Sequence, residues 1–237
     1  MLDVLDVQPG SRMLDIATGP GYLAAAAARR GARVVGIDFS SEMLALASQR
    51  FPEVEFREGD AETLPFPDEC FDGVGISFGV LHFGHPERVL LEAFRVLRPQ
   101  GKIAFTVWAT PEKAVGLGMV QSAITVHGNP DIPLPPGPPF FRFSDRDECV
   151  RTLLEVGFED PSVQEVSQTW HITAPDTPFH AVMRGGVRIA AILKAQEPEA
   201  LEAIEKAVAT HAVAYLRDAQ YHVPMPCVLA SARKPER

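Results

Sequence analysis

Two glycines separated by one residue follow a short apolar run near the N-terminus. The run spans residues 13–17, and residues 19–24 then read GPGYLA, the pattern G-x-G-x-x-A. Where such a turn joins a strand to a helix, the missing side chains let a ligand approach the backbone and the helix N-terminus. The turn alone is a weak signal, because a plain tight turn or a nicotinamide dinucleotide site has the same general shape.

Two carboxylates stand at later positions where a nucleoside can be recognised. Asp38 ends a second apolar run, residues 33–37, and an acceptor-only carboxylate there can take hydrogen bonds from both hydroxyls of a ribose. Asp60 lies in the segment 59–66, GDAETLPF, where a carboxylate and a neighbouring backbone donor can read the edge of adenine. Nicotinamide enzymes do not ordinarily carry this segment, so it discriminates between the two cofactor classes.

Alternating periodicity indicates the elements that position these residues. Strands are predicted at 13–17, 33–37, 54–57, 71–77 and 102–108, and helices at 23–28, 40–51 and 86–98. This alternation predicts a parallel, doubly wound α/β sheet.

The second half of the chain has a more irregular pattern. A proline-rich stretch, residues 128–139, predicts a stiff loop, because prolines lack a donor and fix φ. After it the pattern predicts a helix over 145–157, a strand over 162–172, helices over 179–195 and 198–217, and a last strand over 227–232. The two helices over 179–217 are interpreted as an insertion.

Five segments carry a resemblance to a known family. They are LDIATGPG (14–21), GIDFS (36–40), GDAETLPF (59–66), FDGV (71–74) and RVLRPQGK (95–102). In this order and spacing they resemble class I S-adenosylmethionine-dependent methyltransferases, most closely the quinone-biosynthesis-like branch that acts on small molecules. Five motifs in register are far more specific than any one of them.

The resemblance implies a fold and an activity. It implies one domain over 1–237 with a Rossmann-like seven-stranded sheet, a final antiparallel strand and the helical insertion before that strand. Residues 1–108 would be the cofactor-binding half and 109–237 the substrate-side half. The implied reaction is in-line transfer of a methyl group from S-adenosylmethionine to a small-molecule acceptor, leaving S-adenosylhomocysteine. A nicotinamide-dependent oxidoreductase and a non-catalytic S-adenosylmethionine-binding partner subunit are the alternatives.

The resemblance also implies which residues hold the cofactor. They are Asp15, Ala17, Gly19 and Gly21 around the methionine and ribose, Asp38 at the ribose, Phe39 and Met43 on either side of adenine, Asp60 and Ala61 at its edge, and Ser77 and Phe78 at the methionine end. Met43 is equally compatible with core packing, and Asp60 with a turn carboxylate. Residues 77–83, SFGVLHF, depart from the family's Asn-Ala or Cys-Val, which leaves the contacts near the methyl group undefined.

Catalysis requires little of the protein, because the sulfonium already makes the methyl carbon electrophilic. No metal is predicted, and a general base is needed only if the acceptor arrives protonated. His82 is the best candidate for that base in an acceptor site formed by residues 78–85, Trp108 and the insertion. The alternative is that His82 orients a loop or contacts the cofactor.

Composition limits the partners and the location. The net charge is −9 and the 22 Lys and Arg are scattered, which disfavours nucleic acid. No apolar run reaches the roughly 20 residues of a membrane helix and no secretory signal is visible, so a cytoplasmic protein is expected. Cys70, Cys149 and Cys227 lack metal or redox spacing and are predicted to be buried thiols. Few residues precede the first strand, so we expect an open cofactor site or one covered by a second copy in a homodimer.

Overall fold

The computed structural model describes residues 1–135 and 137–236, which form two compact units. Unit 1 contains Met1–Val107, Gly137–Gln164 and residues 228–236, and unit 2 contains residues 108–135 and Glu165–Cys227. The chain thus leaves unit 1 near the boundary expected at residue 108, but it later returns to that unit twice.

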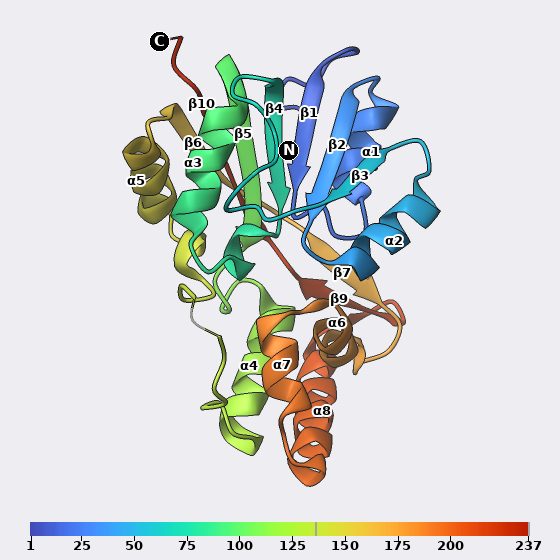
Figure 1. Cartoon of the computed structure of the whole chain (residues 1–237). Helices are drawn as coiled ribbons and strands as arrows, with labels where there is room; N and C mark the ends of the chain where they lie inside the picture. Colours follow the sequence, from blue (N-terminus) through green and yellow to red (C-terminus); the bar gives the residue numbers. More distant parts are fainter. Residues whose placement is uncertain (136, 237) are drawn as a thin grey trace. The chain divides into compact units, whose positions relative to one another are not determined.

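A seven-stranded sheet organises unit 1 (Figure 1). Its order is β3-β2-β1-β4-β5-β10-β6, with parallel pairing from β3 through β5 and with β10 antiparallel. The strands are β1 Arg12–Ile16, β2 Arg33–Asp38, β3 Glu55–Glu58, β4 Phe71–Ser77, β5 Leu97–Trp108, β6 Glu159–Val166 and β10 Cys227–Arg233. The Rossmann-like fold predicted from the sequence is confirmed, including the final antiparallel strand.

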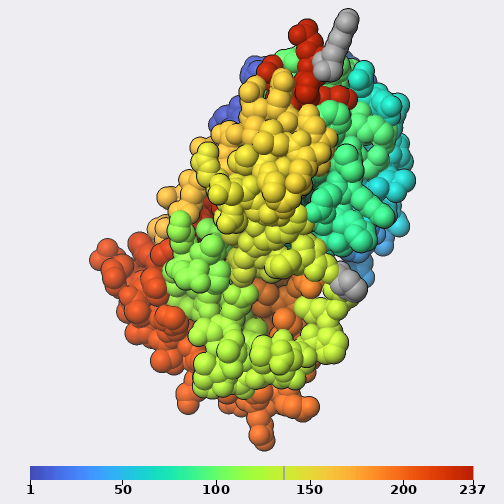
Figure 2. All heavy atoms as spheres, turned by 90° about the vertical axis from the view of Figure 1, so that its left-hand side faces the viewer, coloured from blue at the N-terminus to red at the C-terminus, as the bar shows by residue number. Residues whose placement is uncertain are grey.

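The helices of unit 1 are α1 Tyr22–Arg29, α2 Ser41–Arg50, α3 Pro86–Val96 and α5 Arg146–Val156, with short 3₁₀ turns at Val80–His82 (η1) and Arg142–Ser144 (η2). Side-chain caps start two of them, α2 and α5. The hydroxyl of Ser40 accepts the Met43 amide and starts α2, and Asp145 caps α5 in the same way. Gly157, in the left-handed conformation, ends α5, which lies on the face of unit 1 seen in Figure 2.

Small and branched side chains fill the space around the sheet. The alanine-rich α1 buries Ala24, Ala25 and Ala27, and small side chains let a helix approach a sheet closely. Leu14, Ile16, Val74, Ile76 and Phe105 from the central strands are fully buried. The three cysteines are buried and unpaired by disulfides, as expected.

Two predicted elements of unit 1 have different bounds. The helix expected over 86–98 ends at Val96, because β5 already begins at Leu97 and pairs that residue with Phe71. The strand expected over 162–172 is two strands: β6 joins the main sheet, and β7 Thr169–Ile172 belongs to a second sheet.

Unit 2 combines helices with a small antiparallel sheet. Its helices are α4 Val115–His127, α6 Thr177–Gly185, α7 Arg188–Lys194 and α8 Pro198–Ala212, followed by the 3₁₀ turn η3 Val213–Tyr215. Its sheet has the order β7-β9-β8, with β8 Leu216–Arg217 and β9 Gln220–Pro224. Within the described residues, no helix is long and apolar enough to cross a membrane.

The helical prediction for unit 2 was partly wrong. The helix expected over 179–195 is interrupted at Gly186, whose extended backbone separates α6 from α7. The helix expected over 198–217 ends at Ala212, and its last predicted residues form η3 and β8. The helix α4 was not predicted. The proline-rich stretch forms no helix or strand over 128–135 and 137–139, while residue 136 of that prediction lies outside the described residues.

Candidate functional site

The glycine turn after β1 combines a tight backbone with open space. Ala17, Gly19 and Gly21 all have positive φ, of 53°, 51° and 83°. A Cβ at Gly21 would lie 2.8 Å from Cζ of Phe56, so the fold itself requires glycine there. A Cβ at Gly19 would meet nothing within 4 Å. The turn therefore leaves room above Gly19 for a ligand to reach the backbone.

Asp15 lies beneath this turn and is fully buried. Its Oδ2 accepts hydrogen bonds from the Thr18 hydroxyl at 2.7 Å and from the Ala24 amide at 3.0 Å. Its Oδ1 is buried and has no hydrogen-bond partner among the described residues. Burial raises the pKa of this carboxyl to about 7. Asp15 thus ties the turn to the start of α1 and keeps one acceptor for which the described residues supply no donor.

Asp38, at the end of β2, connects the turn to the next helix. Its Oδ2 accepts the Gly19 amide at 2.8 Å, and its Oδ1 accepts the Ser40 amide at 3.0 Å. A carboxylate offers about four acceptor sites, so both oxygens keep capacity for hydroxyl donors. Asp38 can therefore accept hydrogen bonds from the two hydroxyls of a diol.

Two large apolar side chains next to Asp38 lie at the surface. Phe39 is 80% exposed and Met43 is 41% exposed, so Met43 is not a core residue. Side chains of this kind can cover both faces of a flat ring. The exposed Asp60 accepts the Glu62 amide at 2.8 Å in a turn of its own, and Ala61 beside it is partly buried.

A charged pair on α3 fixes the loop that follows Asp60. Glu92 accepts the Leu64 amide at 2.7 Å, while Arg95 donates to the carbonyls of Leu64 at 3.0 Å and Phe66 at 2.8 Å. The hydrogen bond from Arg95 holds the pKa of Glu92 below its usual range. Sequence reasoning missed this role, although the (i, i+3) spacing of opposite charges was visible.

The end of β4 lies against the glycine turn. Ser77 is exposed. The Phe78 amide donates to the Thr106 carbonyl at 3.1 Å, and the backbone of Phe78 has a positive φ of 55°. A Cβ at Gly79 would lie 2.9 Å from Cβ of Ala17, so the two segments touch. Gly79 is a further residue that the sequence analysis did not select.

His82 belongs to η1, directly after this contact. Its backbone amide donates to the Gly79 carbonyl at 2.9 Å, and its ring meets that of Phe140 edge-on, with centroids 6.3 Å apart. His82 is therefore held, through Gly79, next to the glycine turn within unit 1.

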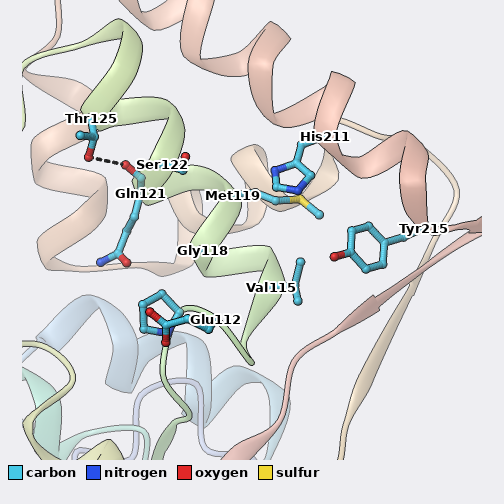
Figure 3. Close-up of a pocket in the computed structure, with 10 residues that line it drawn as sticks. Glu112, Val115, Gly118, Met119, Gln121, Ser122, Thr125, His211 and Tyr215 are labelled. Atoms are coloured by element: carbon cyan, nitrogen blue, oxygen red, sulfur yellow. Dashed lines mark hydrogen bonds between the residues drawn. The ribbon is translucent and has the colours of Figure 1, made fainter.

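Unit 2 contains a pocket of about 470 Å³ that was not predicted (Figure 3). It lies between α4 and the end of α8 with η3, and its lining includes Glu112, Met119, Gln121, Ser122, His211 and Tyr215. A hydrogen bond from the Thr110 hydroxyl lowers the pKa of Glu112. The pocket thus presents carboxylate, amide, hydroxyl and imidazole groups beside a thioether.

Comparisons with known proteins agree with the geometry of unit 1. A family model described as a methyltransferase domain matches residues 14–105. The demethylmenaquinone methyltransferase of Renibacterium salmoninarum is 31% identical over 176 residues, which cover 70% of this chain and 74% of that protein.

Solved structures share the fold at low identity. The YcgJ protein of Bacillus subtilis has a TM-score of 0.62 at 19% identity, covering 100% of this chain and 97% of that chain. Phosphoethanolamine N-methyltransferase 2 of Haemonchus contortus, solved with S-adenosyl-L-methionine, has a TM-score of 0.55 at 19% identity, covering 98% of this chain and 52% of that chain.

These findings decide between the cofactor classes that the glycine turn left open. The matched segment contains the glycine turn, Asp38 and the 59–66 segment, and the match to Renibacterium extends well beyond it. A nicotinamide-dependent oxidoreductase is therefore excluded. The chain belongs to the class I S-adenosylmethionine-dependent methyltransferases of the quinone-biosynthesis type, enzymes that transfer the methyl group of S-adenosylmethionine.

Proposed function

We propose that this enzyme methylates a small molecule in the cytoplasm, with the cofactor held at the carboxyl ends of β1, β2 and β4. The observation that carries the proposal is the turn at Gly19, which is open to a ligand and hydrogen-bonded to Asp38. Around it we assign Asp15, Ala17, Gly19 and Gly21 to the methionine and ribose, Asp38 to the ribose, Phe39 and Met43 to the faces of adenine, Asp60 and Ala61 to its edge, and Ser77 and Phe78 to the methionine end.

The proposed acceptor is a small ring compound related to demethylmenaquinone, for which the matched relatives are named. Two observations support a small acceptor. The net charge of −9 opposes binding to nucleic acid, and unit 2 has a pocket of molecular size lined by hydrogen-bonding groups. A panel of demethylmenaquinone analogues with short side chains is therefore the first set of acceptors to assay.

The protein's own contribution is placement. S-adenosylmethionine supplies an electrophilic methyl group on a sulfonium. Asp38 and the turn at Gly19 would hold the cofactor in place, and Phe39 and Met43 would cover its adenine. His82 is proposed to accept the proton of a hydroxyl or carbon acid acceptor, because it is held beside the turn through Gly79.

A ligand-binding experiment tests the cofactor site. S-adenosylhomocysteine at a hundred times its Kd stabilises the folded chain by about 2.7 kcal/mol, and NADH at the same concentration does not. Asp38→Ala weakens binding by about 2–4 kcal/mol, since two charge-assisted hydrogen bonds are lost. Asp147→Ala, at an exposed carboxylate of α5, is the control. Equal binding by the Asp38 and Asp147 variants would refute the assignment.

A kinetic experiment tests the base. His82→Ala lowers kcat by about two orders of magnitude and leaves the affinity for S-adenosylhomocysteine nearly unchanged. His127→Ala is the matched control, because His127 is exposed at the end of α4 and lies outside the proposed acceptor site. If His82→Ala instead reduces cofactor affinity at unchanged kcat, His82 belongs to the binding site.

A further inference from the structure

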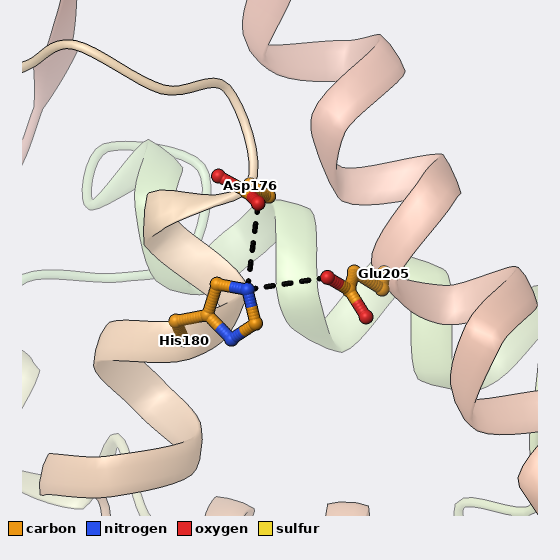
Figure 4. Close-up of side chains that lie close together, drawn as sticks. All are labelled: Asp176, His180 and Glu205. Atoms are coloured by element: carbon orange, nitrogen blue, oxygen red, sulfur yellow. Dashed lines mark ion pairs between the residues drawn. The ribbon is translucent and has the colours of Figure 1, made fainter.

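Three metal-ligating side chains from two segments of unit 2 converge at one point (Figure 4). Asp176 directly precedes α6, His180 lies one turn later, and Glu205 lies on α8. Nε2 of His180 is 3.4 Å from Oδ2 of Asp176 and 3.2 Å from Oε1 of Glu205. We propose that these three residues, the α6–α8 triad, bind a Zn²⁺ ion.

The two distances from Nε2 of His180 are close to those between ligands of a shared ion, and all three ligand atoms lie within 4.8 Å of one another. Zinc ligands lie about 2.0–2.2 Å from the ion, which places two neighbouring ligand atoms of a tetrahedral site about 3.3–3.6 Å apart. Charge-assisted N–H···O bonds are normally shorter, about 2.7–2.9 Å. Nε2 also carries at most one hydrogen, so it cannot point at both carboxylates. A cation between the three atoms satisfies Nε2 and both oxygens together.

The chemistry of the triad suits zinc. Imidazole nitrogen and carboxylate oxygen are both ordinary zinc ligands, and two carboxylates offset the charge of the ion. The three side chains are 37–41% exposed, which leaves a coordination position for water. The ring of the buried Phe179 meets that of His180 edge-on at 5.3 Å and supports its orientation. In Figure 4 the second ring nitrogen of His180 points away from both carboxylates.

The proposed ion joins two helices that already pack together. Phe179 and Val182 are buried on α6, as are Ile204 and Val208 on α8, and the two helices are in contact. An ion bound by the folded chain and not by the unfolded chain stabilises the fold. The expected role of the triad is therefore to fix α6 against α8, with no part in methyl transfer.

Zinc titration of the full chain, prepared without a histidine tag and stripped of metal with EDTA, tests this inference. The wild-type chain binds one equivalent of Zn²⁺, measured by calorimetry, and its unfolding temperature rises. His180→Ala and Glu205→Gln each weaken binding at least about tenfold, because loss of a direct ligand exceeds the tenfold loss typical of an outer partner. Glu202→Gln, also on α8, and the exposed His127→Ala leave the affinity unchanged.

Two outcomes overturn the proposal. One is a wild-type chain that binds no zinc, or a Glu205→Gln variant that binds it as tightly as wild type. In that case the triad is only an ion pair. The other involves His171 and His222, which face each other across β7 and β9 with ring centroids 4.5 Å apart. If His171→Ala abolishes binding and His180→Ala does not, the ion belongs to that pair instead.

Discussion

The two units assemble their polar groups in different ways. In unit 1, Asp15, Asp38 and Ser77 stand on successive parallel strands, and the sheet brings them to one edge. In unit 2, the triad and the pocket combine side chains from helices that are distant in the sequence. In a parallel sheet, the polar residues of a site follow the ends of strands, a pattern that can be recognised in the sequence. A cluster formed by packed helices has no such sequence pattern.

The largest expected effect concerns the buried carboxyl of unit 1. The pKa of Asp15 is about 7 in the folded chain and 3.8 when unperturbed, so folding favours the protonated form. Its contribution to stability is complete below pH 4 and is lost as the pH rises through 7. The loss amounts to about 4 kcal/mol.

Asp15→Asn isolates this contribution, because an amide does not titrate and keeps an acceptor oxygen for Thr18 and Ala24. We expect the free energy of unfolding of the wild type, measured in urea, to fall relative to the variant by about 4 kcal/mol between pH 4 and pH 8. Asp147→Asn, at an exposed carboxylate, follows the wild type. Parallel profiles for the wild type and Asp15→Asn would show that Asp15 is ionised in the fold.

The second expected effect separates backbone strain from packing in the glycine turn. Gly21 and Gly10 both have positive φ, of 83° and 88°, but a Cβ would clash with Phe56 only at Gly21. Gly10→Ala should cost about 1–2 kcal/mol of unfolding free energy from the conformation alone. Gly21→Ala should cost about 2–4 kcal/mol, since overpacking adds to the strain. Equal losses in urea unfolding would mean that the Phe56 ring moves aside freely.

These positions also show what the sequence could predict. The turn with Gly19 and Gly21 and the strand end at Asp38 were predicted because positive φ favours glycine and Asp38 follows an apolar run, while their role in cofactor binding stays a prediction. Ser40 caps the start of α2 and Gly157 ends α5, and both residue types are capping signals that can be recognised in the sequence. Local sequence rules therefore predicted the turns and helix ends that depend on the conformation of a residue's own backbone.

Most of the missed features depend on contacts between distant segments. The break between α6 and α7 does not, because the consecutive Gly185 and Gly186 are a local helix-stopping signal that the sequence analysis did not use. Gly79 is required by its contact with Ala17, which the sequence does not show. The same holds for Asp176 and Glu205, which meet only when α6 packs against α8. Tertiary contacts of this kind leave no periodic signal.

The third expected effect concerns the loop that follows Asp60. Arg95→Met removes donors to the carbonyls of Leu64 and Phe66 and leaves Glu92 without its ion-pair partner, so we expect the free energy of unfolding to fall by about 2–3 kcal/mol. Arg98→Met is the control, because its pair with Asp72 is about 40% exposed on both sides. Urea unfolding at pH 7 measures both. Equal losses would show that the loop is held by other contacts.

Arg95 holds the pKa of Glu92 below its usual range in the folded chain. The contribution of Glu92 to the free energy of unfolding is therefore present above its unfolded-state pKa and is lost as the pH falls through its folded-state pKa. We therefore expect the difference between wild type and Arg95→Met to shrink in acid. A difference that stays constant from pH 7 to pH 3 would assign the effect to the two carbonyl contacts alone.

The smallest expected effect concerns Lys113 in unit 2, whose ion pair we compare with that of Arg95 in unit 1. Nζ of Lys113 lies 2.7 Å from Oε2 of Glu165, but the two side chains are 59% and 42% exposed, so water and salt screen the pair. Lys113→Met should change the free energy of unfolding by less than about 0.5 kcal/mol at 0.15 M salt. Lys206→Met, at an exposed lysine of α8, is the control for loss of a surface charge. If Lys113→Met costs as much unfolding free energy as Arg95→Met, and the cost persists in 1 M salt, exposed pairs would hold unit 2 as firmly as the partly buried network around Arg95 holds unit 1. The two units would then differ only in whether their polar residues can be predicted from the sequence, and not in how strongly those residues stabilise the fold.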